Sequence, residues 1–312
     1  TQLKHFFGTE WIDATTILIS DGGKFYRYNI NTKTGNLIQE STETAENQTF
    51  DTAKENMAFT EANNLYIFNK NKEKIVVTSN SDKNIVSGQT ISRNEFGIEG
   101  GIFWSPKSTY LAFYQKDETD VADYPLLDIT ETPGKLMNIK YPMIGQKSEK
   151  PKVGIYNLAN KKTIFITPNG KSDSYLTNLS WTPDEQFILI AEVNREQNDM
   201  SLNLYNAATG TYIQTLVNER NDRWVEPEHP AFFPSGSSNN FVWMSEKDGF
   251  QNLYYYSIDG KLIRQLTINK FVTKSILGSN DKGTEIYFEA TGPDATNTLA
   301  YKVDTRGKQT LL

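Results

Sequence analysis

Hydrophobic and polar residues alternate along most of the chain in short runs that are separated by turns. In 102–115 (IFWSPKSTYLAFYQ), an apolar and aromatic start is followed by Ser-Pro, a polar turn and a second alternating run. The same order returns at 179–192 (LSWTPDEQFILIAE) and at 231–246 (AFFPSGSSNNFVWMSE), where Pro234 marks the turn. Alternation with a period of two is typical of strands that bury one face. Each copy therefore predicts a pair of antiparallel strands.

The copies form a repeat that spans the chain. Weaker copies without the proline occur at 9–21, 49–61 and 276–290. A second pair of short strands with Gly- or Asn-bearing turns is predicted at 64–79, 201–217, 252–267 and 298–312. Four antiparallel strands repeated about every 40 residues are typical of a β-propeller blade. We predict an all-β fold, a β-propeller of four-stranded antiparallel blades, with six units that start near residues 9, 49, 101, 178, 230 and 276.

Two intervals are longer than the repeat requires. One is 80–101, between the second and third units, and it contains Glu95. The other is 117–152, inside the third unit. Long loops in a compact domain are usually functional or form small subdomains, and the alternative is a tolerated surface insertion.

Composition narrows the classes of function. The 312 residues carry a net charge of −6 with both signs interspersed, so no basic stripe exists that could follow a nucleic-acid backbone. The absence of cysteine excludes disulfides, thiolate zinc sites and a cysteine nucleophile. No apolar run approaches the ~20 residues that cross a bilayer, so we predict no membrane span. No signal peptide is visible, although one could have been removed before residue 1.

Catalytic and metal-binding patterns are missing from the sequence. The two histidines are His5 and His229, and neither adjoins a plausible nucleophile. No Gly-x-Ser-x-Gly elbow occurs, and His229 in EPEHP is better interpreted as a hydrogen-bonded turn residue. The acidic stretches 117–120 and 279–283 lack the ligand spacing of a calcium loop. We predict no catalytic residue, no metal and no cofactor in this chain.

Three other short patterns carry no predicted chemistry. The glycines of 97–101 (GIEGG) precede a strand rather than a helix, so they do not resemble a phosphate cradle. Asn47-Gln-Thr and Asn178-Leu-Ser match the glycosylation sequon, a match that is expected by chance.

Glu95 is the candidate binding residue. Phe96, Gly97 and Ile98 follow it, and this apolar setting would fix the backbone. A carboxylate next to a partly desolvated site suits a ligand ammonium, because the ion pair gains strength where water is scarce. The alternative is an ordinary solvated loop residue.

Long segments of the chain resemble one known family. Residues 94–119, 141–160, 176–198 and 224–267 are similar to the propeller of the dipeptidyl peptidase IV family. These are prolyl-specific serine exopeptidases of the prolyl oligopeptidase superfamily, and the likeness is closest to the bacterial branch that contains prolyl tripeptidyl peptidase. The resemblance implies an N-terminal eight-bladed propeller and a C-terminal α/β-hydrolase domain that carries the Ser, Asp and His. Residues 1–312 are then expected to be a non-catalytic propeller fragment of a larger enzyme, whose catalytic triad lies outside this sequence.

The resemblance also implies roles for the two long intervals. The family propeller gates access and binds the free α-ammonium of the peptide substrate through acidic residues on an inserted segment, and the matching position here is Glu95. Dipeptidyl peptidases have two adjacent glutamates, whereas this chain has Asn94-Glu95, which resembles the tripeptidyl branch. Glu99 is a weaker candidate. The interval 117–152 resembles the arm that joins subunits into homodimers, and the bacterial members are exported, so a periplasmic or exported location is expected.

Two alternatives remain open at this point. The chain is alternatively a stand-alone propeller that binds ligands or proteins without a hydrolase partner, or a sensor or scaffold propeller of the periplasm. A Gly-x-Ser-x-Gly elbow encoded downstream in the parent gene would support the peptidase and exclude both alternatives.

Overall fold

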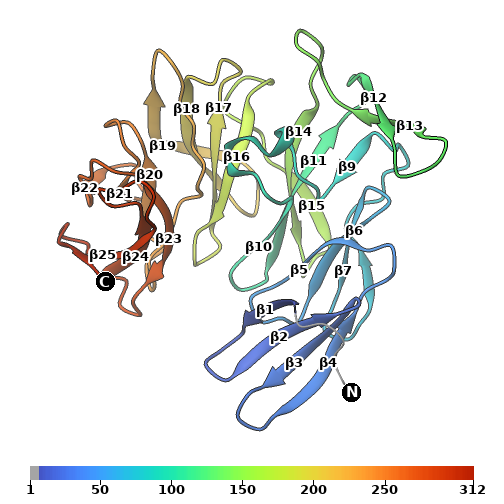
Figure 1. Cartoon of the computed structure of the whole chain (residues 1–312), viewed down its shortest axis with the longest axis horizontal. Helices are drawn as coiled ribbons and strands as arrows, with labels where there is room; N and C mark the ends of the chain where they lie inside the picture. Colours follow the sequence, from blue (N-terminus) through green and yellow to red (C-terminus); the bar gives the residue numbers. More distant parts are fainter. Residues whose placement is uncertain (1–6) are drawn as a thin grey trace. The chain divides into compact units, whose positions relative to one another are not determined.

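The chain forms a series of antiparallel sheets, each built from strands that are close in sequence (Figure 1). The computed structural model describes residues 7–312, so His5 lies outside the described residues. The described chain divides into two compact units. The first holds the residues up to Ser92 together with Gly100–Trp104 and Leu111–Thr163, and the second holds Arg93–Glu99, Ser105–Tyr110 and Ile164–Leu312.

The first unit contains three sheets and a separate hairpin. The first two sheets are β1(Phe7–Trp11), β2(Thr16–Asp21), β3(Lys24–Asn29), β4(Thr34–Glu40) and β5(Glu46–Phe50), β6(Met57–Glu61), β7(Asn64–Phe68), β8(Lys74–Val76). The third is β10(Ile102–Trp104), β11(Tyr110–Asp117), β14(Lys150–Asn157), β15(Lys162–Phe165), with β9(Ile85–Ser87) paired to β11. The hairpin β12(Asp123–Asp128) and β13(Lys135–Lys140) pairs with no other sheet among the described strands.

The second unit contains three further sheets. They are β16(Tyr175–Trp181), β17(Phe187–Val193), β18(Asp199–Asn206), β19(Tyr212–Arg220), then β20(Asn240–Ser245), β21(Asn252–Ser257), β22(Leu262–Gln265), and last β23(Thr273–Ser279), β24(Glu285–Ala290), β25(Leu299–Asp304), β26(Gln309–Leu311). A short 3-10 segment, η1(Ser92–Gly97), precedes β10. No helix in residues 7–312 has the length and apolar character needed to cross a membrane.

The six sheets correspond to the six predicted units, so the prediction of an all-β chain of antiparallel blades is confirmed. The fifth unit departs from the four-stranded pattern. Its expected first strand is reduced to one isolated bridge between Phe232 and Val242. Pro230 and Pro234 flank that bridge, and a proline has no N–H with which to extend a ladder.

The cores explain why the second strand of several blades carries a run of consecutive apolar residues and does not alternate. In the first unit, Leu18 and Phe25 of one sheet share a core with Met57 and Phe59 of the next. A strand that is covered on both faces needs apolar residues, or polar residues with hydrogen-bond partners, at every position. In the second unit, every residue of β17 after Phe187 is buried, and all of these except Glu192 are apolar.

The first strand of several blades contains a bulge. In β5 the register shifts between Glu46 and Thr49, and in β16 it shifts between Thr177 and Ser180. Each bulge contains one asparagine with positive φ, 50° at Asn47 and 52° at Asn178. Asparagine adopts this left-handed conformation more readily than most residues, so the two sequon-like matches coincide with a repeated backbone feature.

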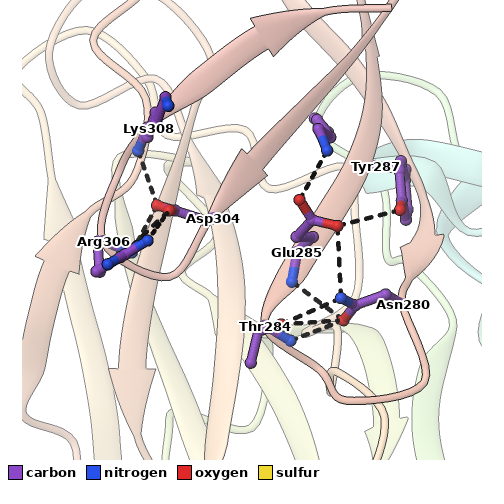
Figure 2. A network of polar contacts seen from close by, with 8 residues as sticks. Asn280, Thr284, Glu285, Tyr287, Asp304, Arg306 and Lys308 are labelled. Carbon is purple, nitrogen blue, oxygen red and sulfur yellow. Dashed lines mark hydrogen bonds and ion pairs between the residues drawn. The ribbon is translucent and has the colours of Figure 1, made fainter.

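Turn residues of the last sheet use their polar side chains on their own backbone, as Figure 2 shows. The side-chain oxygen of Asn280 accepts hydrogen bonds from the N–H groups of Thr284 and Glu285, at 2.8 and 3.2 Å. One carboxylate oxygen of Asp304 accepts from the N–H groups of Arg306 and Lys308, at 2.9 Å each. Asn280 and Asp304 therefore each close a tight turn with their own side chains.

Candidate functional site

The segment that carries Glu95 has an unusual backbone. Ser92, Arg93, Asn94 and Phe96 all have φ between 54° and 66°, in the left-handed region. Glu95 alone is extended within this run, with φ −58° and ψ 155°, and its side chain is exposed. Each left-handed residue other than glycine costs roughly 1 kcal/mol. Tertiary contacts must therefore hold this turn in place.

Phe96 supplies the first of those contacts. Its ring is buried in the core of the second unit and meets the ring of Tyr175 edge-on at 5.0 Å. Its carbonyl oxygen accepts a hydrogen bond of 3.0 Å from the hydroxyl of Thr177. Tyr175 is fixed in turn by Arg195, which donates to its hydroxyl at 2.6 Å. The residue that follows Glu95 is thus anchored by both its side chain and its backbone.

Gly97 brings the turn against the loop between β19 and β20. A Cβ at this position would lie 2.1 Å from the carbonyl oxygen of Glu228, so only glycine allows the approach. The same loop is tied to β16, because the side-chain amide of Asn178 donates to the carbonyl oxygen of Pro227 at 2.6 Å. The Glu95 turn and the loop around residues 225–229 therefore lie side by side in the second unit.

The region is strongly acidic. A cavity of about 80 Å³ lies beneath the loop, and four glutamates are among its lining residues: Glu219, Glu226, Glu228 and Glu246. The pKa of Glu226 is raised by burial, and further by the negative charges of Glu228, Glu246 and Glu95. Burial also raises the pKa of Glu219, which accepts hydrogen bonds from Ser245 at 2.8 Å and Trp243 at 3.2 Å. A concentration of negative charge of this kind attracts cations.

The other sequence candidates lie around this site. Glu99 is exposed and acts on His229 through its charge. His229 is half-buried, and burial lowers its pKa although Glu228 and Glu99 oppose that effect. His229 lies at a bend, and its imidazole makes no hydrogen bond within the described part of this unit, so the hydrogen bond expected from the sequence is not present.

Sequence reasoning missed the residues that surround Glu95. Glu226 and Glu228 lie in the EPEHP stretch, in which the sequence singles out only His229. Asn178 matches only a chance sequon, and the sequence assigns no role to Thr177. The two glutamates that flank Pro227 were a usable signal, because a proline restricts its own backbone and that of the residue before it.

Comparison with known proteins identifies the family to which nearly all of this chain is similar. Residues 19–312 match the family model described as "Dipeptidyl peptidase IV (DPP IV) N-terminal region". Curated relatives include dipeptidyl peptidase 4 of Arthroderma otae, 24% identical over 79% of this chain, and dipeptidyl aminopeptidase B of Saccharomyces cerevisiae, 22% identical over 82%. This chain spans 34% of the length of each of these two relatives.

Solved structures agree on the fold. A candidate dipeptidyl aminopeptidase IV of Bacteroides ovatus matches 99% of this chain with a TM-score of 0.87 and 36% identity. Porphyromonas gingivalis dipeptidyl peptidase 4 matches 98% with a TM-score of 0.80 and 22% identity, a likeness of fold. This chain covers 46% and 43% of those two chains. Its blades are those of a β-propeller, and the chain belongs to the dipeptidyl peptidase IV N-terminal region family.

Proposed function

We propose that this chain is the propeller domain of a prolyl-specific serine exopeptidase and that Glu95 binds the free α-ammonium of the peptide substrate. One observation carries the proposal: at the position that resembles the family's ammonium-binding segment, an exposed carboxylate projects from a backbone run of left-handed residues. Strained backbone that is held by buried contacts is found mainly at functional sites. The turn keeps Glu95 in one place while leaving its carboxylate available.

The chemistry of the ammonium explains why such an enzyme releases residues from the amino end. A carboxylate and an ammonium form charge-assisted hydrogen bonds that are stronger than neutral ones. A peptide with a blocked amino end leaves the carboxylate without its partner and loses that energy. Glu226 adds a second negative charge near Glu95, whose own charge contributes to the raised pKa of Glu226. Asn94 stands beside Glu95 at the position where dipeptidyl peptidases have a second glutamate.

The rest of the enzyme lies outside these 312 residues in this proposal. The propeller gates the entry of substrate, and a hydrolase domain of the same polypeptide supplies the nucleophile, acid and base. The Bacteroides ovatus relative supports this division, since more than half of its chain has no counterpart here. The family's bacterial members are exported, and we place this enzyme outside the cytoplasm for that reason.

The hairpin β12–β13 is proposed to join two subunits. Leu127, Ile129 and Leu136 are 65%, 81% and 70% exposed. Apolar side chains gathered on one exposed element are typical of protein contact surfaces. The hairpin lies in the interval that resembles the family's dimerisation arm, so we propose that its binding partner is a second copy of the enzyme.

The ammonium role is tested by kinetics on the full-length enzyme. Glu95→Gln keeps the shape of the side chain and removes its charge, and we expect kcat/KM on free X-Pro and X-X-Pro peptides to fall about 100-fold or more. The rate on N-acetylated peptides should not change. Glu99→Gln is the matched control, because Glu99 is a nearby exposed glutamate.

The same experiment decides the length of the released peptide. A preference for X-X-Pro over X-Pro substrates in the wild type would establish tripeptide release, and the reverse would establish dipeptide release. Equal kinetics of Glu95→Gln and wild type on free peptides would reject the proposed role and leave Glu95 as a solvated loop residue.

A further inference from the structure

Two adjacent residues of β16 hold the two backbone segments on which the glutamates of the site stand. The hydroxyl of Thr177 donates to the carbonyl oxygen of Phe96 at 3.0 Å, and the amide of Asn178 donates to that of Pro227 at 2.6 Å. Both donors are almost completely buried, Thr177 with 0% and Asn178 with 6% of its surface exposed. In such surroundings each hydrogen bond fixes its carbonyl firmly, because water cannot replace the donor.

The two accepting carbonyls have equivalent places in sequence. Phe96 immediately follows Glu95, and Pro227 immediately follows Glu226. Each hydrogen bond therefore fixes the carbonyl group of the residue that directly follows a glutamate. Consecutive donors on one strand consequently restrain the backbone next to both glutamates.

The bulge in β16 explains how adjacent residues serve two segments. In a regular strand, neighbouring side chains point to opposite faces of the sheet. The bulge between Thr177 and Ser180, with Asn178 at φ 52°, changes the direction of the side chains locally. The equivalent bulge of β5 does not hold a distant loop. The amide of Asn47 donates instead, at 2.7 Å, to the hydroxyl of Thr60 on the neighbouring strand.

We propose that Thr177 and Asn178 are positioning residues of the ammonium site, which set Glu95 and Glu226 at the separation that one ammonium requires. This inference rests on the proposed function of Glu95 and adds to it the residues that make the site specific. Loss of either donor allows one glutamate to move without removing any charge. Recognition of the free amino end then weakens while the chemistry of peptide cleavage is unaffected.

The test uses the full-length enzyme and single substitutions chosen for their backbone. Asn178→Gly removes the amide but keeps the positive φ, which glycine adopts without strain. Asn47→Gly is the matched control in the other unit, with the same φ and the same loss of one amide donor. Thr177→Val removes the hydroxyl at constant shape, and Thr177→Ser restores a donor at the same position.

The readout is the ratio of kcat/KM for a free peptide to kcat/KM for its N-acetylated form. We expect Asn178→Gly and Thr177→Val each to lower this ratio about tenfold, through a higher KM and an unchanged kcat, and Thr177→Ser to recover most of it. Asn47→Gly should leave the ratio as in the wild type. These results would support the proposal, because a general loss of stability does not distinguish free from blocked substrates.

Other results would overturn it. An unchanged ratio in Asn178→Gly and Thr177→Val, with a large effect of Glu95→Gln, would reject the positioning role and leave the proposed function standing. An equal loss in Asn47→Gly would show a general effect of the bulge and would also reject it. If Glu95→Gln itself had no effect, both the proposed function and the positioning role would fail.

Discussion

Glu192 is a buried carboxylate that has no cationic partner within the described part of its unit. It is 4% exposed and accepts hydrogen bonds from the hydroxyl of Tyr205, the amide of Asn203 at 2.9 Å and the N–H of Gly170 at 2.5 Å. A buried charge is costly unless such donors surround it. These bonds fasten the loop before β16, the strand that carries Thr177, to the middle of its sheet.

Tyr205→Phe should therefore destabilise the chain by about 2 kcal/mol, because it removes a hydrogen bond to a buried charge. Chemical unfolding monitored by tryptophan fluorescence measures the loss. Tyr212→Phe is the matched control, since Tyr212 is exposed and donates or accepts one bond of 3.0 Å with Thr215, and it should cost less than about 0.5 kcal/mol. Equal losses in the two variants would contradict the role of Glu192.

His229 should make stability depend on pH. Its pKa in the folded chain is lowered, chiefly by burial, so the folded state binds a proton less readily than the unfolded state. The contribution to stability is thus present above the usual histidine pKa of about 6.5 and is lost as pH falls through the lower folded value. We expect the midpoint of urea unfolding to fall on acidification from pH 7.5 to 5.5, and His229→Gln to weaken that dependence. Parallel pH profiles of the two proteins would refute this.

At the scale of elements, two blades repeat one polar motif. Asn64 and Asn252 are the first residues of β7 and β21. The side-chain oxygen of each accepts a hydrogen bond from a threonine hydroxyl two residues beyond the next strand, Thr78 at 3.1 Å and Thr267 at 2.8 Å. Each threonine hydroxyl in turn accepts a hydrogen bond of 2.9 Å from the backbone N–H of the leucine that follows the asparagine, Leu65 in one blade and Leu253 in the other. The motif ties the outer strand pair together at the point where the chain leaves for the next blade.

Asn252→Ala should lower the free energy of unfolding by about 2–3 kcal/mol, since it leaves buried polar groups around β21 and β22 without partners. Asn64→Ala should cost less, because Asn64 is only half-buried whereas Asn252 is buried. Equilibrium urea unfolding of both variants provides the comparison. A larger loss for Asn64→Ala would contradict this explanation by burial.

At the scale of the whole molecule, the hairpin exposes most of its residues, including several large apolar side chains. Leu127 and Leu136 stand directly opposite each other on β12 and β13. A two-stranded hairpin with apolar residues facing solvent gains stability when a partner covers it. In the proposed dimer, the second subunit would cover these apolar side chains and stabilise the hairpin.

Leu127→Ser combined with Leu136→Ser should raise the dissociation constant of the proposed dimer of the full-length enzyme about 100-fold, because two apolar contacts are lost together. Sedimentation velocity measures the change. Val76→Ser is the control, since Val76 is 55% exposed on β8 of the same unit, and it should leave the dimer intact. A dimer that resists the double substitution would show that other surfaces hold the subunits together.

Local pattern was sufficient for the blades themselves. Period-two alternation and Gly- or Asn-bearing turns predicted the six sheets and the second strand pairs, because strand formation and tight turns depend on neighbouring residues. The same pattern did not predict β9 or the reduced first strand of the fifth blade. Each of these depends on pairing with one partner strand at a distance, or on the lack of N–H groups at Pro230 and Pro234.

Glu95 was identified from the sequence only through its apolar neighbours and a family resemblance. The residues that surround it could be identified only from the tertiary structure. Thr177 and Phe96 are 81 residues apart, and Asn178 and Pro227 are 49 apart. The alternation of hydrophobic and polar residues predicts which face of a strand is buried, but it does not predict which loop packs against a bulge. The sequence by itself therefore determined the blades and the candidate carboxylate, and the packing of β16 against two distant loops decided how that carboxylate is held, because such contacts form only when the sheets are assembled.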